Sequence, residues 1–167
     1  MSNDSFFHEG MRQLQDKRET RRIADKKKKK IVHSIFTDDN RTFIQRCPMV
    51  FVATADEHGH PECSYKGGLP GFVRILDGQT LAIPDYDGNG MYRSWGNLLV
   101  NPFIGLLFID FENQSRLRVN GSAKISADDP LLAKYPGAQL LVRAKVDQVF
   151  LNCARLIHKH QRVSASP

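Results

Sequence analysis

The sequence predicts a mainly β protein of the α+β class, built as a closed or half-closed antiparallel barrel of six or seven strands. Short segments rich in Val, Ile, Leu and Phe follow Met49, and most are separated by turn residues such as "EHGH" and "LPG". The dipeptide Asp77-Gly78 predicts a two-residue hairpin turn, because that turn needs positive φ. Strict alternation in "RLRVNGSAKIS" is typical of a strand with one buried face.

The expected strands are short apolar segments, most of them bounded by turn residues. Within the alternating segment, Leu117 and Val119 fall on one face, and the two arginines fall on the other face, where solvent exposure is the ordinary explanation. In chain order the candidate segments are "MVFVATAD" (49–56), "PECSYKGG" (61–68), "GFVRIL" (71–76), "QTLAIPD" (79–85), "FIGLLFID" (103–110), "RLRVNGSAKIS" (116–126) and "LLVRAKVDQVF" (140–150).

One short helix is expected inside this β region, at about residues 90–101. Asn89 is well placed as its N-cap, and Asn101-Pro102 would end it. Its apolar residues follow helical spacing and predict one buried stripe, formed by Met91, Trp95, Leu98 and Leu99.

An N-terminal helical arm is expected over residues 1–46, followed by a barrel domain over 47–167. Residues 6–32 lack proline and contain many helix formers, and "TDDN" (37–40) supplies capping residues for a short helix that continues to Arg46. Residues 1–30 hold ten Lys/Arg and five Asp/Glu, so they supply +5 of the total formal charge of +6. The basic character therefore belongs to the arm. In a dimer, this arm could pack on the partner subunit.

Length and composition fit an ordinary soluble protein. The chain has 167 residues, 41% hydrophobic and 25% charged. No apolar run is long enough to span a membrane, and the first ten residues do not resemble a secretory signal. Three widely spaced cysteines predict neither a disulfide framework nor a zinc knuckle. We therefore expect a cytoplasmic protein with reduced thiols.

The segment "DYDGNGMYRSWGN" (85–97) is the first candidate for binding chemistry. A helix N-terminus presents unpaired amide groups and the positive end of the helix dipole, so it can bind an anion. Glycines allow close approach of the backbone, Arg93 offers a fork of donors, and Ser94 adds a hydroxyl. The pattern indicates a phosphate site; a glycine-rich turn with a solvated arginine is the simpler alternative.

Two further segments carry polar side chains. In "CSYKGG" (63–68), Ser64 and Lys66 share one strand face, although the glycines also fit a corner where a strand bends. In "IHKHQR" (157–162), two histidines lie two residues apart without a neighbouring Cys, Asp or Glu, so no metal site is predicted.

Taken in order, these segments resemble the pyridoxamine 5′-phosphate oxidase-like family of flavin-binding split barrels. The resemblance covers about residues 49–149 and rests on "ATADEHGHPECSYKGG", "IPDYDGNGMYRSWGNLLVNPFIGLLFIDF" and "RLRVNGSAKI". The segment "VFLNCARLIHKHQR" is similar to the ending of a bacterial subgroup whose reaction is unassigned. The resemblance implies a Greek-key split barrel, FMN as cofactor, and a homodimer with the flavin at the subunit interface.

The resemblance also implies which residues bind the cofactor. The strand at residues 64–67 is expected to contact the isoalloxazine and ribityl chain, and the short helix and the loop before it are expected to hold the phosphate. Ser64 stands where the oxidases usually have arginine, and Arg116 stands where the family often has glutamine. No catalytic residue is predicted. The expected cofactor-binding residues are Ser64, Tyr65, Lys66, Gly67, Asn89, Arg93, Ser94, Asn97, Arg116 and Arg118.

The function implied is an FMN-dependent oxidoreductase that acts on a small-molecule substrate or electron donor not identifiable from the sequence. The C-terminal segment departs from the Arg-x-His-x-x-Arg-like set of the oxidases proper, which argues against pyridoxamine-phosphate oxidase activity. An alternative is a protein that binds flavin, haem or a deazaflavin without turnover. A third, less favoured interpretation is binding of nucleic acid or another acidic partner through residues 12–30.

Overall fold

The structure is a computed structural model that describes residues 6–152 and 154–164. The chain divides into two compact units, Met1–Val32 and His33–Pro167. The helix at residues 38–46 falls within the second of these units, whereas the sequence places it with the arm. No helix among the described residues is long and apolar enough to cross a membrane.

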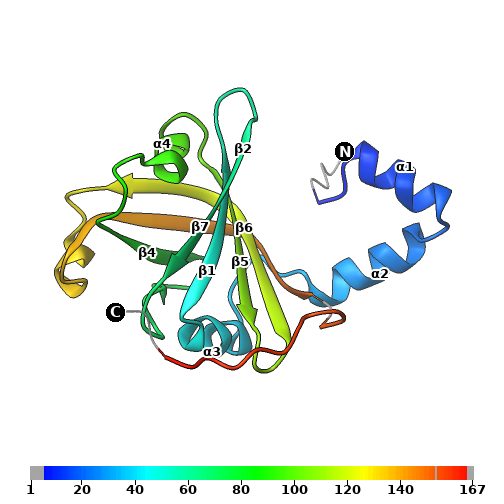
Figure 1. Ribbon diagram of the computed structural model, residues 1–167. Helices are drawn as coiled ribbons and strands as arrows, with labels where there is room; N and C mark the ends of the chain where they lie inside the picture. The colour runs from blue at the N-terminus through cyan, green and yellow to red at the C-terminus, as the bar shows by residue number, and fades with distance from the viewer. Residues whose placement is uncertain (1–5, 153, 165–167) are drawn as a thin grey trace. The chain divides into compact units, whose positions relative to one another are not determined.

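The second unit is built on one antiparallel seven-stranded sheet that curls but does not close (Figure 1). The sheet order is β2-β1-β5-β6-β7-β4-β3, so β2 and β3 are its edges. Strands β5, β6 and β7 form a meander of neighbouring strands. Strand β4, which precedes them in the chain, pairs with the last of them, β7, and this gives a Greek-key arrangement. This confirms the predicted split-barrel class. The strands are β1 (Met49–Ala55), β2 (Pro61–Gly67), β3 (Arg74–Ile75), β4 (Thr80–Tyr86), β5 (Phe103–Asp110), β6 (Ser115–Ser126) and β7 (Ala138–Asn152).

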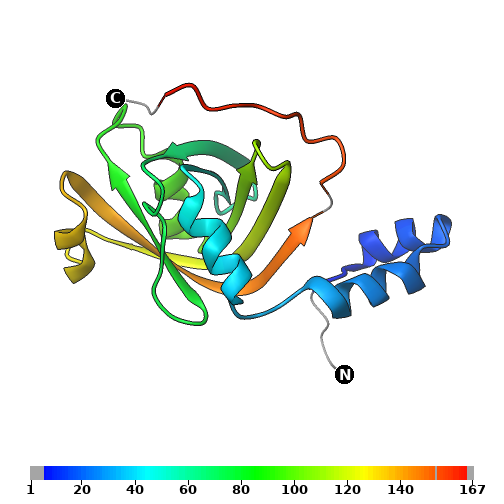
Figure 2. The same cartoon turned by 90° about the horizontal axis from the view of Figure 1, so that it is seen from below.

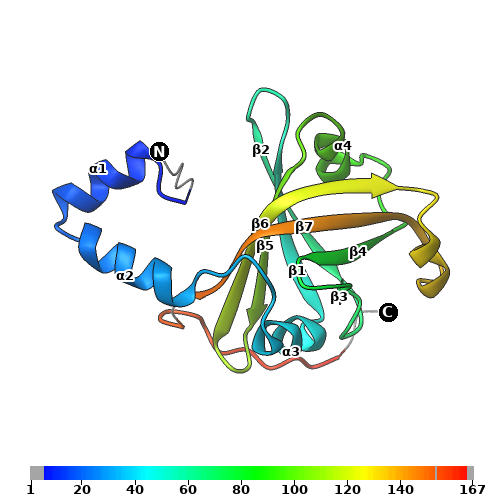
Figure 3. The same cartoon turned by 180° about the vertical axis from the view of Figure 1, so that it is seen from behind.

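The core fills the inside of the curled sheet. The alternation predicted for β6 is confirmed, because Leu117 and Val119 are buried and Arg118 is exposed. Two helices lie at opposite ends of the sheet, α3 (Asp38–Arg46) and α4 (Arg93–Val100) (Figures 1 and 3). Figure 2 shows α3 lying across the lower end, where its Ile44 is fully buried in the core.

Helix α3 begins as its sequence predicts. Thr37 is the N-cap, and its hydroxyl accepts a hydrogen bond from the Asn40 amide at 3.3 Å. The Asn40 side chain accepts in return from the Thr37 amide at 3.1 Å, which completes a capping box. The cap satisfies two backbone donors and fixes where the helix begins, so its apolar face meets the core.

The arm contains two helices rather than the single one predicted over residues 6–32. Helix α1 (Glu9–Lys17) ends before Glu19, which has a left-handed backbone with φ of 54°, and α2 (Arg21–Ile31) follows. The two helices are linked by an ion pair of 2.8 Å between Arg12 and Asp25. Residues that favour helix therefore do not prevent a break when a side-chain pair holds the two segments in a hairpin.

The short helix near the β region is also shorter than predicted. It begins at Arg93, and its N-cap is Tyr92 in a left-handed conformation, not Asn89. Asn89 instead accepts a hydrogen bond from the Met91 amide within the preceding loop. The predicted apolar stripe is only half correct. Trp95 and Leu98 are buried, whereas Met91 and Leu99 are exposed.

The hairpin predicted at Asp77-Gly78 exists between β3 and β4, but its turn is wider than two residues. The Leu76 amide donates to the Thr80 carbonyl, which leaves three residues in the loop. The Asp77 carboxylate accepts from the amides of Gln79 and Thr80 at 2.7 Å each. These hydrogen bonds lower the pKa of Asp77 and satisfy the turn without a positive φ at Gly78.

The C-terminal tail, residues 154–164, contacts the loop between β5 and β6. The His160 ring stacks on the Phe111 ring, with centroids 4.9 Å apart and planes inclined by 8°. The His160 amide donates to the Phe111 carbonyl, and the Gln114 side chain donates to the Ile157 carbonyl at 2.7 Å.

A 3₁₀ helix, η1 (Pro130–Lys134), connects β6 to β7.

Candidate functional site

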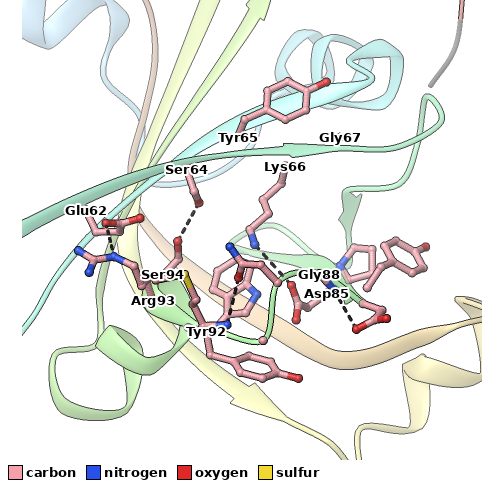
Figure 4. A pocket seen from close by; sticks show the side chains of 17 residues that line it. Glu62, Ser64, Tyr65, Lys66, Gly67, Asp85, Gly88, Tyr92, Arg93 and Ser94 are labelled. Carbon is pink, nitrogen blue, oxygen red and sulfur yellow. Dashed lines mark hydrogen bonds and ion pairs between the residues drawn. The ribbon is translucent and has the colours of Figure 1, made fainter. Parts of the chain in front are cut away.

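A pocket of about 380 Å³ lies between edge strand β2, the loop after β4 and the start of α4 (Figure 4). Its lining comes from β2 and from residues 84–95. Gly90 has φ of 71°, a conformation that glycine adopts readily, so the loop can bend between the strand and the helix. Two segments that the sequence analysis treated separately therefore meet at one cavity.

Strand β2 turns three polar side chains toward α4 and the loop. Glu62, Ser64 and Lys66 alternate along the strand and share one face. Figure 4 shows Tyr65 on the opposite side of the strand, where its ring meets the Phe51 ring edge-on at 5.9 Å. The backbone of Tyr65 borders the pocket, but its side chain faces away from it.

Lys66 lies deepest among the basic side chains of the pocket. Its ammonium nitrogen is 3.5 Å from Oδ1 of Asp85 and 4.6 Å from the centroid of the Trp95 ring. Asp85 and Trp95 are almost completely buried, with exposed fractions of 7% and 2%. The carboxylate and the aromatic face together stabilise the cation and fix its position.

Arg93 and Ser94 occupy the first turn of α4. Nε of Arg93 donates to Oε2 of Glu62 at 3.0 Å, and the arginine side chain is 63% exposed. The hydroxyls of Ser94 and Ser64 are 2.8 Å apart, so one donates to the other across the pocket (Figure 4). Strand β2 and helix α4 are thus joined by a charged pair and by a hydroxyl pair.

Seven of the ten residues predicted to bind cofactor line this pocket, and three do not. Ser64, Tyr65, Lys66, Gly67, Asn89, Arg93 and Ser94 belong to its lining. Asn97 points instead toward β1, where its amide donates to the Thr54 hydroxyl at 3.0 Å. Arg116 and Arg118 lie on β6 and take no part in the lining, so a role for them with the cofactor stays a prediction.

The structure adds Glu62, Asp85, Tyr92 and Trp95 to the site. The alternation that pairs Ser64 with Lys66 could also have revealed Glu62, two residues before Ser64 on the same strand. Trp95 has helical spacing and was interpreted as core, which it also is. Asp85 begins the candidate segment 85–97, but its local sequence does not indicate the pairing with Lys66, which belongs to another strand.

The fold and pocket define a class of protein, an open antiparallel barrel with a polar ligand pocket beside its edge strand. Residues 36–153 match the family model described as pyridoxamine 5′-phosphate oxidase, which is more than half of the chain. The chain therefore belongs to the pyridoxamine 5′-phosphate oxidase family. Comparison with curated proteins gave no match.

Solved structures with the same fold include three of different description. HupZ of Group A Streptococcus is 19% identical, with 75% of this chain and 99% of that chain covered and a TM-score of 0.57. A candidate pyridoxamine 5′-phosphate oxidase of Lactobacillus delbrueckii is 22% identical, with coverage of 71% and 95% and a TM-score of 0.58. An F420 reductase is 19% identical, with coverage of 68% and 98% and a TM-score of 0.51. At these identities the likeness concerns the fold alone.

Proposed function

We propose that this protein is a cytoplasmic FMN-binding flavoprotein and an oxidoreductase whose substrate is a small molecule. One observation carries the proposal. The side chains of Ser64 and Lys66 on β2 meet those of Arg93 and Ser94 on α4 around one pocket. These are residues that the family resemblance assigns to the flavin and to its phosphate. The volume of about 380 Å³ is in the range of small-molecule sites.

The donors of the pocket fit the chemistry of FMN. Arg93 and Ser94 would hold the phosphate at the first turn of α4, where amide groups also point outward. Lys66 would lie beside the N1–C2 carbonyl side of the isoalloxazine, where a positive charge favours the anionic reduced ring. FMN itself supplies the hydride or electron transfer. The protein contributes position, charge and shelter from water.

We propose further that the protein forms a homodimer with the flavin at the subunit interface. Tyr65 and Phe103, on strands β2 and β5, are 59% and 67% exposed. A partner subunit packed on this face of the sheet would cover these two side chains. The molecular mass in solution, measured by light scattering at several concentrations, tests this part of the proposal.

The first test is a visible absorbance spectrum of the protein purified without added cofactor, with mass identification of any molecule released on denaturation. Flavin bands and the mass of FMN would support the proposal. A colourless protein that takes up neither FMN, haem nor a deazaflavin would overturn it. Binding without turnover is separated from catalysis by asking whether nicotinamide donors reduce the bound flavin and whether it reoxidises faster than free flavin.

The Arg93→Ala variant tests the phosphate assignment. Loss of a charge-assisted hydrogen bond is expected to weaken FMN binding about ten- to hundredfold. Riboflavin has no phosphate, so its affinity should change little and serves as the control. The measurement is flavin fluorescence quenching during titration of wild type and variant. Unchanged FMN affinity in the variant would show that the phosphate lies elsewhere.

A further inference from the structure

Both basic side chains that line the pocket are already paired with carboxylates. Lys66 pairs with Asp85, and Arg93 pairs with Glu62 (Figure 4). A third carboxylate, Asp87, also belongs to the lining. A ligand phosphate that enters this pocket therefore meets no unpaired cation there and must share one with a carboxylate.

The two pairs differ in how readily they can open. The Lys66 and Asp85 side chains are 27% and 8% exposed, and Lys66 also lies over the Trp95 ring. The Arg93 side chain is 63% exposed and is held by Glu62 through Nε alone. Among the described residues, its two terminal nitrogens make no hydrogen bond. Arg93 is therefore the cation that a phosphate can recruit.

We propose that Glu62 is a specificity-determining residue that competes with the ligand phosphate for Arg93. This inference rests on the proposed function of the same pocket. A phosphate bound at Arg93 brings up to two negative charges close to the Glu62 carboxylate, which is only 20% exposed and so is weakly screened by solvent. Glu62 therefore lowers the affinity of the pocket for phosphorylated ligands and favours their exchange.

An opposite effect of Glu62 must be compared with this repulsion. By holding Nε, the carboxylate also orders the arginine, which saves part of the conformational entropy lost on binding. Ordering one exposed side chain contributes less than the interaction of full like charges at close range. The repulsion therefore outweighs the ordering effect, and the net effect of Glu62 is to weaken phosphate binding. Removal of the Glu62 charge is expected to tighten phosphate binding.

The experiment compares FMN and riboflavin affinities of wild type, Glu62→Gln and Arg93→Ala/Glu62→Gln by flavin fluorescence titration. Glutamine keeps an acceptor oxygen for Nε and removes the charge. We expect Glu62→Gln to bind FMN more tightly by on the order of tenfold, mostly through slower dissociation, with unchanged riboflavin affinity. The gain should disappear when Arg93 is also absent. Glu57→Gln, an exposed residue of the β1–β2 turn outside the pocket, controls for net charge.

Several outcomes would overturn the inference while leaving the proposed function intact. They are FMN affinity that is unchanged or weaker in Glu62→Gln, equal tightening of FMN and riboflavin, or an equal effect of Glu57→Gln. If wild type binds no flavin, the proposed function fails, and inorganic phosphate becomes the probe. Trp95, the only tryptophan of the chain, lines the pocket and reports occupancy by fluorescence. Glu62→Gln should then respond at lower phosphate concentration than wild type, and an equal or weaker response overturns the inference.

Discussion

At the scale of single residues, Gly121 shows how close the backbones of two strands can approach. The register between β6 and β7 shifts between Asn120 and Gly121, where Asp147 is the extra residue of a bulge in β7. A Cβ atom built on Gly121 would overlap the carbonyl oxygen of Lys145 on the neighbouring strand. Backbone atoms cannot move aside as a flexible side chain can, so this position admits only glycine.

We expect Gly121→Ala to lower the free energy of unfolding by about 3 kcal/mol, because β6 and β7 must separate to relieve the overlap. Gly105→Ala provides a matched control on the adjacent strand β5. Its Cβ would lie 3.5 Å from the Asn120 side-chain oxygen and 3.6 Å from the Ala53 Cβ, which are ordinary contacts. Urea denaturation of both variants measures the difference. Equal stability of the two would contradict the predicted overlap.

At the scale of secondary-structure elements, α3 illustrates a segment whose ends are specified locally. Replacement of Thr37 by alanine removes the hydroxyl that accepts from the Asn40 amide. We expect Thr37→Ala to destabilise the second unit by about 1 kcal/mol, and Thr37→Ser to retain most of the stability because serine is also a good N-cap. Thermal unfolding monitored by circular dichroism tests both variants. A serine variant as unstable as the alanine variant would argue against capping.

Elements with such local signals could be predicted from the sequence. Turn residues and alternation located all seven strands to within a few residues except β3, which is reduced to Arg74–Ile75. The start of α4 could not be predicted, because Asn89 is the better capping residue by type. Tyr92 becomes the N-cap, and its hydroxyl donates to Gln139, a residue distant in sequence. A long-range contact of this kind leaves no trace in local spacing.

The candidate site shows the same division between local features, which could be predicted, and long-range contacts, which could not. Residues within the two local motifs, such as Lys66 and Arg93, were found by type and spacing. Their partners Asp85 and Glu62 were not, because each ion pair joins segments that only the folded sheet brings together. The sequence thus predicted donors that line the pocket but not the carboxylates that pair with them.

At the scale of the whole molecule, the buried thiol of Cys47 links global stability to pH. Cys47 follows α3 and belongs to the main core cluster, with an exposed fraction of 3%. Burial, with a smaller contribution from the negative charge of Asp110, raises the pKa of Cys47 from 9.0 to about 12. Between these two values the unfolded chain loses the thiol proton and the folded chain keeps it.

The folded state therefore binds more protons than the unfolded state above pH 9, and its stability must fall as the pH rises. We expect the contribution of Cys47 to decrease by about 1 kcal/mol for each pH unit between pH 9 and 11. Lysines and tyrosines also titrate in this range. The measurement is therefore the slope of unfolding free energy against pH, obtained from urea denaturation at each pH and compared between wild type and Cys47→Ala. The alanine variant is expected to be less stable at neutral pH but to lose less stability on the alkaline side. Cys63→Ser removes an exposed thiol and should keep the wild-type slope, and identical slopes for wild type and Cys47→Ala would show that the core thiol does not couple to unfolding.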